Sequence, residues 1–141
     1  MLMNYSLVSD SWGKEEKLSI QKVIKSNIFT YHGKYVKEFE RKFAKYFGCK
    51  YSVMVNSGSS ANLISVASLF FKKKNALKKG DEVIVPTLSW STTYYPLQQY
   101  GLKLKFIDID INSLNMNVED IIKACTKKTK LVVAVNILGN P

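Results

Sequence analysis

The sequence predicts an α/β domain with a mostly parallel sheet and helices on both of its faces. Two observations lead to this fold class. From residue 51 onward, short apolar runs alternate with helical segments in the order β-α-β-α-β-α-β, which is the pattern of a parallel sheet with covering helices. The chain also has 141 residues, of which 46% are hydrophobic, so it is long and apolar enough to bury a core.

Two helices are predicted before this alternation begins. Residues 1–12 form an irregular arm, and residues 13–26 have the apolar and charged periodicity of an amphipathic helix. A turn that contains His32 and Gly33 follows. Apolar residues then recur at helical spacing up to Gly48, which is a typical helix end, and they are Val36, Phe39, Phe43 and Phe47.

The boundaries of the elements after residue 50 are predicted from turn residues and prolines. The turn at residues 56–60 separates a predicted strand from a helix that is apolar nearly all round, so we expect that helix to be buried. Pro96 is incompatible with a regular helix interior, so the helix that contains it is expected to start or kink there. The predicted strands are 51–55, 82–85, 102–109 and 131–135, and the predicted helices are 61–71, 89–100 and 117–124.

Composition excludes several classes of protein. No apolar run approaches the roughly 18 residues of a membrane span, and the first residues lack the regions of a signal peptide. Cys49 and Cys125 have the spacing of neither a disulfide framework nor a metal site, so a cytoplasmic setting is expected. The net charge is +10, but all basic residues except Arg41 are Lys, whereas base readout favours Arg. We therefore interpret the charge as solvated surface, and a nucleic-acid partner is disfavoured.

The segment from Asn56 to Ala61 is the sharpest local motif. It lies between a predicted strand and a predicted helix, where free N–H groups, hydroxyls and Gly58 would form a cradle for a phosphate group. Gly58 and Ser59 are the candidate binding residues. An ordinary Ser-rich helix cap is the alternative. The chain has neither a G-x-G-x-x-G motif nor a P-loop.

A second polar cluster at residues 86–93 also follows a predicted strand. Ligands of open parallel sheets bind beyond the carboxyl ends of the strands, so Trp90 is expected at the same rim as Ser59, where it could stack on a flat ring. The alternative is a core aromatic residue. Asp108 and Asp110 are expected to end a strand and open a turn. His32 is the only His, and no base or nucleophile partner for it is visible, so we expect a surface or turn role. A Ser-His-Asp arrangement would require this residue, and no metal-binding set is visible.

The order of motifs along nearly the whole chain resembles the DegT/DnrJ/StrS family. The matching segments are 7–13, 36–40, 44–48, 53–63, 80–86 and 106–110. The resemblance implies the aspartate-aminotransferase fold (fold type I) and the cofactor pyridoxal 5'-phosphate (PLP). Residues 13–141 would then be an incomplete, N-terminal part of the PLP-binding large domain.

The resemblance also implies roles for three residues. Gly58 and Ser59 would hold the PLP phosphate, and Trp90 would stack on its ring. No catalytic residue is assigned, because the family's ring-nitrogen carboxylate and its Schiff-base Lys, or the His that replaces that Lys in the dehydratases, would lie beyond Pro141. The chain alone is therefore expected to be inactive. One extra residue at 30–33 departs from the family pattern in a turn near the active site.

Residues 90–101 and 135–141 resemble the branch of 3-dehydratases, whereas the family's aminotransferases usually have Phe or Tyr at the position of Trp90 and His at that of Asn136. The implied substrate is a nucleotide-linked 4-keto-6-deoxy sugar of O-antigen or lipopolysaccharide biosynthesis, with glutamate as amino donor and a homodimer as the assembly. A nucleotide-sugar aminotransferase is the alternative. A non-catalytic phosphate-binding α/β module is the alternative of another class.

Overall fold

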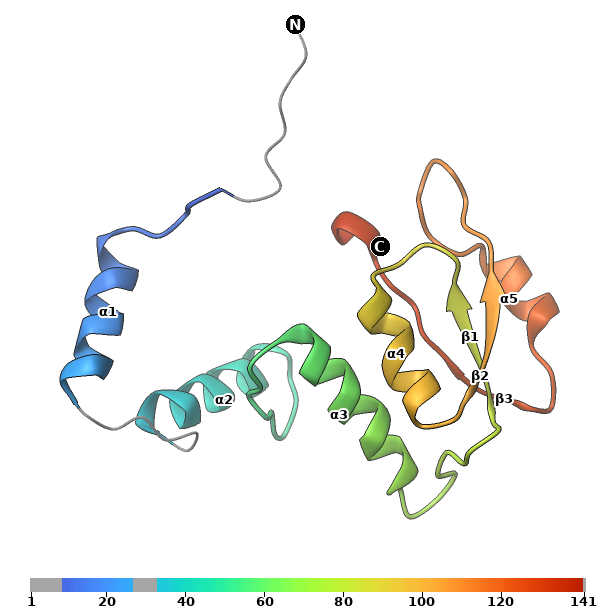
Figure 1. Ribbon diagram of the computed structural model, residues 1–141, viewed down its shortest axis with the longest axis horizontal. Coiled ribbons are helices and arrows are strands. Elements are labelled where there is room, and N and C mark those ends of the chain that lie inside the picture. Colours follow the sequence, from blue (N-terminus) through green and yellow to red (C-terminus); the bar gives the residue numbers. More distant parts are fainter. Residues whose placement is uncertain (1–8, 27–32, 141) are drawn as a thin grey trace, which may run out of the picture. The chain divides into compact units, whose positions relative to one another are not determined.

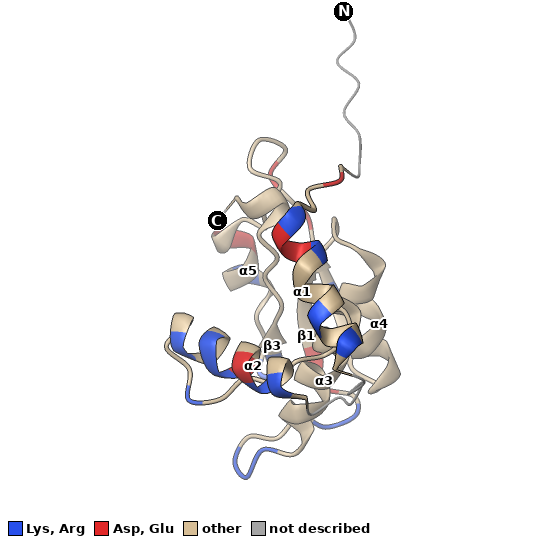
Figure 2. Cartoon of the chain, turned by 90° about the vertical axis from the view of Figure 1, so that its left-hand side faces the viewer, with Lys and Arg blue, Asp and Glu red and all other residues tan. Residues whose placement is uncertain are grey.

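The computed structural model describes residues 9–26 and 33–140, and these fall into two compact units that divide between Met54 and Val55. The first unit contains α1 (Lys14–Lys25) and α2 (Lys34–Tyr46). The Glu16 carboxylate accepts the Gly13 N–H at 2.7 Å and so satisfies one of the free donors at the start of α1. Gly48 has a φ of +66°, the left-handed conformation that ends many helices. Both predicted helices are confirmed, and their charged residues are distributed along them (Figure 2).

The predicted strand at residues 51–55 is wrong. The Met54 N–H donates to the Glu40 carboxylate of α2 at 2.9 Å, and the Ser52 hydroxyl donates to the Glu40 carbonyl at 2.9 Å. A strand requires a neighbouring strand for its ladder, and no strand among the described residues pairs with this segment. Its apolar composition predicted the strand, but composition does not supply the partner.

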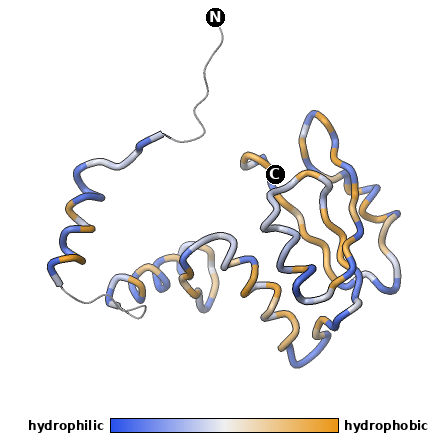
Figure 3. Tube along the Cα trace, in the orientation of Figure 1, coloured by the Kyte–Doolittle hydropathy of each residue, from blue (hydrophilic) through white to orange (hydrophobic). Residues whose placement is uncertain are grey.

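The second unit contains a parallel sheet with the strand order β2-β1-β3. The strands are β1 (Glu82–Pro86), β2 (Lys103–Ile107) and β3 (Thr129–Val132), and Figure 3 shows them as mostly hydrophobic segments. The helices are α3 (Gly58–Phe70), α4 (Ser91–Gln99) and α5 (Val118–Ala124), and a short 3-10 turn, η1 (Ile137–Gly139), follows. Apart from the strand at 51–55, the predicted alternation is confirmed.

Helices cover both faces of this sheet, as predicted (Figure 1). Val83 and Val85 lie in the core beside α3 and α4, together with Val66, Leu77, Leu97 and Leu102. Side chains alternate across a strand, so Ile84 and its register partner Lys105 lie on the other face. There the Lys105 Nζ atom donates to the Ala124 carbonyl at the end of α5, at 2.6 Å.

The expectation of a fully buried α3 is wrong. Of its side chains only Val66 is buried, whereas Ile64 is 50% exposed and Phe71, just after the helix, is 85% exposed. One side of α3 packs on the core, and no element among the described residues covers its remaining apolar side chains. The apolar pattern correctly indicates surfaces that can be buried, but burial needs an element to pack against.

The structure also shows where Pro96 and the two cysteines lie. Helix α4 begins at Ser91 and continues through Pro96, so of the two predicted alternatives, a start or a kink at Pro96, the start is wrong. Cys49 and Cys125 are free and exposed. None of the helices in the described part of the chain is long and apolar enough to cross a membrane.

Candidate functional site

A cavity of about 710 Å³ lies at the carboxyl edge of the sheet. Three segments line it: the start of α3, the loop between β1 and α4 together with the start of α4, and residues 135–138 after β3. All three residues that the sequence predicted as binding residues, Gly58, Ser59 and Trp90, line this cavity. The structure therefore brings together two motifs that lie about 30 positions apart in the sequence.

The start of α3 combines a helix cap with unused donors. Ser57 is the N-cap, and its hydroxyl accepts the Ser60 N–H at 3.2 Å, while the Ser60 hydroxyl donates to Asn56 Oδ1 at 2.6 Å. These two hydroxyls are occupied by the cap. The Ser59 hydroxyl and the N–H groups of Gly58 and Ser59 have no acceptor among the described residues. The motif is therefore an ordinary cap that also leaves donors free for an anion.

Gly58 leaves room in the cavity. A Cβ atom built at this position would meet no other atom within 4 Å, and the residue does not adopt the left-handed conformation. A glycine here is therefore required neither by the backbone nor by packing among the described residues. The space beside the start of α3 is therefore open at this position.

Trp90 lies at the mouth of the cavity as the N-cap residue of α4, and it is 77% exposed. The alternative of a core aromatic residue is therefore wrong. The Thr93 N–H donates to the Trp90 carbonyl at 2.9 Å, and the Ser89 and Thr93 hydroxyls are bonded to each other at 2.8 Å. These bonds fix the turn that presents the indole ring.

Tyr94 anchors helix α4 on the sheet. Its hydroxyl donates to the Pro86 carbonyl at the end of β1, at 2.9 Å, and its ring contacts that of Phe106 on β2 at a centroid distance of 5.5 Å. Burial raises the pKa of Tyr94, so the hydroxyl stays protonated and keeps its donor role at neutral pH. The start of α4 is thus held on strands β1 and β2.

The carboxylates of Asp108 and Asp110, which follow β2, do not line the cavity. The Thr87 hydroxyl donates to Asp108 at 3.1 Å, which connects the ends of β1 and β2. Asp110 accepts the N–H groups of Ser113 and Asn112 at 2.8 and 3.0 Å, and these bonds lower its pKa. The prediction that Asp108 and Asp110 end a strand and open a turn is confirmed. His32 lies outside the described residues.

Sequence reasoning missed Asn62, which also lines the cavity. The signal was present, because a residue three positions after Ser59 lies on the same face of a helix.

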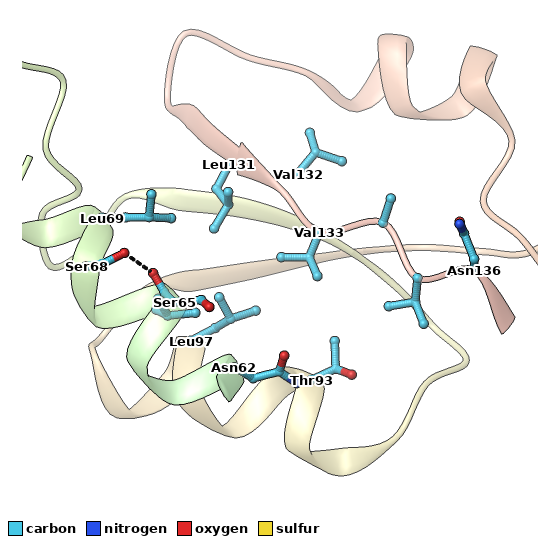
Figure 4. Close-up of a pocket in the computed structure, with 13 residues that line it drawn as sticks. Asn62, Ser65, Ser68, Leu69, Thr93, Leu97, Leu131, Val132, Val133 and Asn136 are labelled. Carbon is cyan, nitrogen blue, oxygen red and sulfur yellow. Dashed lines mark hydrogen bonds between the residues drawn. The ribbon is translucent and has the colours of Figure 1, made fainter. Parts of the chain in front are cut away.

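A second cavity of about 710 Å³ lies beside the first, between α3, α4 and the segment from β3 to Asn136 (Figure 4). Asn62, Thr93 and Asn136 line both cavities.

Comparison with known proteins identifies the family. The model of the DegT/DnrJ/EryC1/StrS aminotransferase family matches residues 10–141. This chain belongs to that family. The resemblance inferred from the motifs is thereby confirmed, as is the fold that it implies.

Two curated relatives of this chain share one name with each other. GDP-4-keto-6-deoxy-D-mannose 3-dehydratase of Escherichia coli O55:H7 is 59% identical over 140 residues, which are 99% of this chain and 36% of the relative. The enzyme of that name from Yersinia pseudotuberculosis is 55% identical over 141 residues, which are all of this chain and again 36% of the relative. The chain therefore spans about a third of the length of the curated relatives it matches.

A solved structure has the same fold over this region. The crystal structure of GDP-4-keto-6-deoxymannose-3-dehydratase with a trapped PLP–glutamate geminal diamine superimposes with a TM-score of 0.92 at 59% sequence identity. The match covers 98% of this chain and 36% of that one. The described units thus correspond to one part of a larger PLP-enzyme fold.

Proposed function

We propose that the complete protein containing this chain is a PLP-dependent 3-dehydratase of GDP-linked 4-keto-6-deoxymannose in O-antigen or lipopolysaccharide biosynthesis. The observation that carries this proposal is the 59% identity with an enzyme of that name over 99% of the chain. Glutamate is the proposed amino donor, because the similar crystal structure holds a PLP–glutamate adduct. A homodimer in the cytoplasm belongs to the same proposal.

The cavity at the carboxyl edge fits the cofactor. The free N–H groups of Gly58 and Ser59 and the Ser59 hydroxyl can bind the phosphate, and the positive end of the α3 dipole favours its charge. The exposed Trp90 ring can stack on the pyridine ring. When bound, PLP supplies an electron sink that stabilises a carbanion. In this proposal Gly58, Ser59 and Trp90 bind and orient the cofactor, and no residue of this chain is assigned to proton transfer.

Ligand binding by the complete gene product tests these assignments. We expect Ser59→Ala to weaken binding of pyridoxamine 5'-phosphate about tenfold or more, since hydrogen bonds to charged groups contribute about 1.5–3 kcal/mol. Trp90→Ala should weaken it by about two- to tenfold, since aromatic stacking contributes about 0.5–1.5 kcal/mol. Pyridoxamine phosphate is chosen because it forms no imine with the many Lys residues. Ser68→Ala is the matched control, because its hydroxyl donates to Ser65 at 2.7 Å near the other end of α3. Unchanged binding in both site variants would refute the assignments.

The reaction is tested by product analysis with GDP-4-keto-6-deoxymannose and glutamate. A dehydratase yields a sugar that lacks the C3 oxygen and contains no new nitrogen, and it releases ammonia and 2-oxoglutarate. An aminotransferase, the activity after which the family is named, yields an aminated sugar and 2-oxoglutarate without ammonia. A non-catalytic phosphate-binding module would give neither product.

A further inference from the structure

Pro96 creates a hydrogen-bonding deficit inside α4. A proline has no N–H, so the carbonyl four residues earlier loses its partner within the helix. In α4 that carbonyl belongs to Thr92. Pro96 and the following Leu97 are buried and hold this side of α4 on the core, while Thr92 is half-buried and lines the cavity at the carboxyl edge.

Asn62 supplies the missing donor. Its Nδ2 atom donates to the Thr92 carbonyl at 3.3 Å, across the contact between α3 and α4. Figure 4 shows Asn62 on α3 beside Thr93 of α4, and both residues line the same two cavities. The proline in one helix is therefore compensated by an amide from another helix, which lies 30 residues before Thr92 in the chain.

This hydrogen bond joins the two halves of the proposed site. Asn62 lies one helical turn after Gly58 and Ser59, and Thr92 lies two residues after Trp90. The start of α3 would bind the cofactor phosphate, while the start of α4 presents the ring on which the pyridine would stack. The separation of these two groups must match the length of the cofactor.

We propose that Asn62 is a positioning residue, which holds the Trp90 side of the site at the correct distance from Gly58 and Ser59 through the Thr92 carbonyl that Pro96 leaves free. This role rests on the proposed function in one respect, namely that one ligand spans both helix starts. The link between Asn62 and Pro96 does not depend on it.

The test is a double-mutant cycle in the complete gene product. Asn62→Ala should weaken pyridoxamine 5'-phosphate binding about tenfold, measured by quenching of Trp fluorescence. Pro96→Ala restores an N–H that can donate to Thr92 within the helix, so Asn62 becomes dispensable in that background. There Asn62→Ala should change the affinity by no more than about twofold. Ser65→Ala, one turn further along α3, is the matched control and should leave the affinity unchanged in both backgrounds.

The outcomes separate the possible roles. An equal loss of affinity in both backgrounds overturns the proposal, because Asn62 would then contact the ligand itself. No loss in the original background overturns it as well. If the unmodified protein does not bind pyridoxamine phosphate, both the proposed function and the positioning role fail. Thermal unfolding of the four proteins of the cycle, the unmodified protein and three variants, would still show whether Asn62 and Pro96 are coupled, so the two failures are distinguishable.

Discussion

At the scale of single residues, substitution of Gly58 can distinguish what the fold requires from what the proposed phosphate site requires. Its backbone conformation is open to any residue, and a Cβ atom would point into open space. We therefore expect Gly58→Ala to fold normally, with a free energy of unfolding within about 0.5 kcal/mol of the original. The added methyl group would occupy the space next to the free N–H groups, so affinity for pyridoxamine phosphate should fall at least about tenfold.

Urea unfolding and fluorescence titration of the complete gene product check the two halves of this prediction. Gly101→Ala is the opposite control, because there a Cβ would lie 2.6 Å from the Lys79 side chain and φ is +74°. It should lower stability through backbone strain. If Gly58→Ala bound the ligand as tightly as the original, the phosphate would have to bind elsewhere.

Glu82 gives a pH-dependent prediction at the same scale. Its carboxylate accepts the Thr129 hydroxyl at 2.6 Å and the Thr126 hydroxyl at 3.2 Å, and these bonds lower the pKa of Glu82 from its ordinary value of 4.5. A lowered pKa in the folded state contributes stability above the unfolded value, and this contribution is lost as the pH falls through the folded value. The stability that the Thr129 hydroxyl contributes to the folded state should therefore be present at neutral pH and shrink below about pH 4.5.

Thermal unfolding of Thr129→Val and the unmodified protein at a series of pH values measures this effect. The difference between their melting temperatures should decrease as Glu82 becomes protonated. A difference that stays constant from neutral to acidic pH would show that the hydroxyl contributes only through packing.

At the scale of elements, Lys105 shows how a charged side chain can fasten a helix to a sheet. Its Nζ atom donates to the carbonyl of Ala124, the last residue of α5, at 2.6 Å, where a cation also interacts well with the helix dipole. Lys105→Met should lower the free energy of unfolding by about 1 kcal/mol. Lys103→Met is the matched control, since this side chain of the same strand is exposed. Equal effects of the two variants in urea unfolding would contradict a specific role for the bond.

Elements could be predicted where the local pattern is sufficient. The helices of the first unit, α5 with its Asn117 cap, and the three paired strands follow from periodicity and caps. The strand at residues 51–55 and the burial of Ile64 were wrong, because both depend on a partner element that a pattern does not reveal. The same reason explains why Pro96 was recognised as a difficulty while the distant Asn62 donor was not.

The candidate site was predicted better than the details that support it. Strand ends and helix starts meet at one edge of a parallel sheet, so the sequence predicts Ser59 and Trp90 at the same rim, and both line the cavity there. Topology alone brings these residues together. The division of the hydroxyls between the Ser57 cap and the free Ser59 group depends on side-chain geometry, which the sequence does not specify.

At the scale of the whole molecule, the second unit has an open sheet edge. Strand β3 pairs with β1, and no strand among the described residues pairs with its other side. The neighbouring groove is lined largely by apolar side chains, and Val132 of β3 is 40% exposed. An unpaired strand edge beside exposed apolar surface is a template for pairing with another chain.

We therefore expect a polypeptide of residues 1–141, expressed alone, to self-associate at micromolar concentration. A Lys on an edge strand disfavours such pairing, so Val132→Lys should shift the population toward the monomer in sedimentation velocity. Ile122→Lys is the matched control, because Ile122 is 67% exposed and lies on α5, whose end is bonded to Lys105 of β2, and it should leave association unchanged. A monomeric original polypeptide, or equal effects of the two Lys variants, would show that the β3 edge does not direct association.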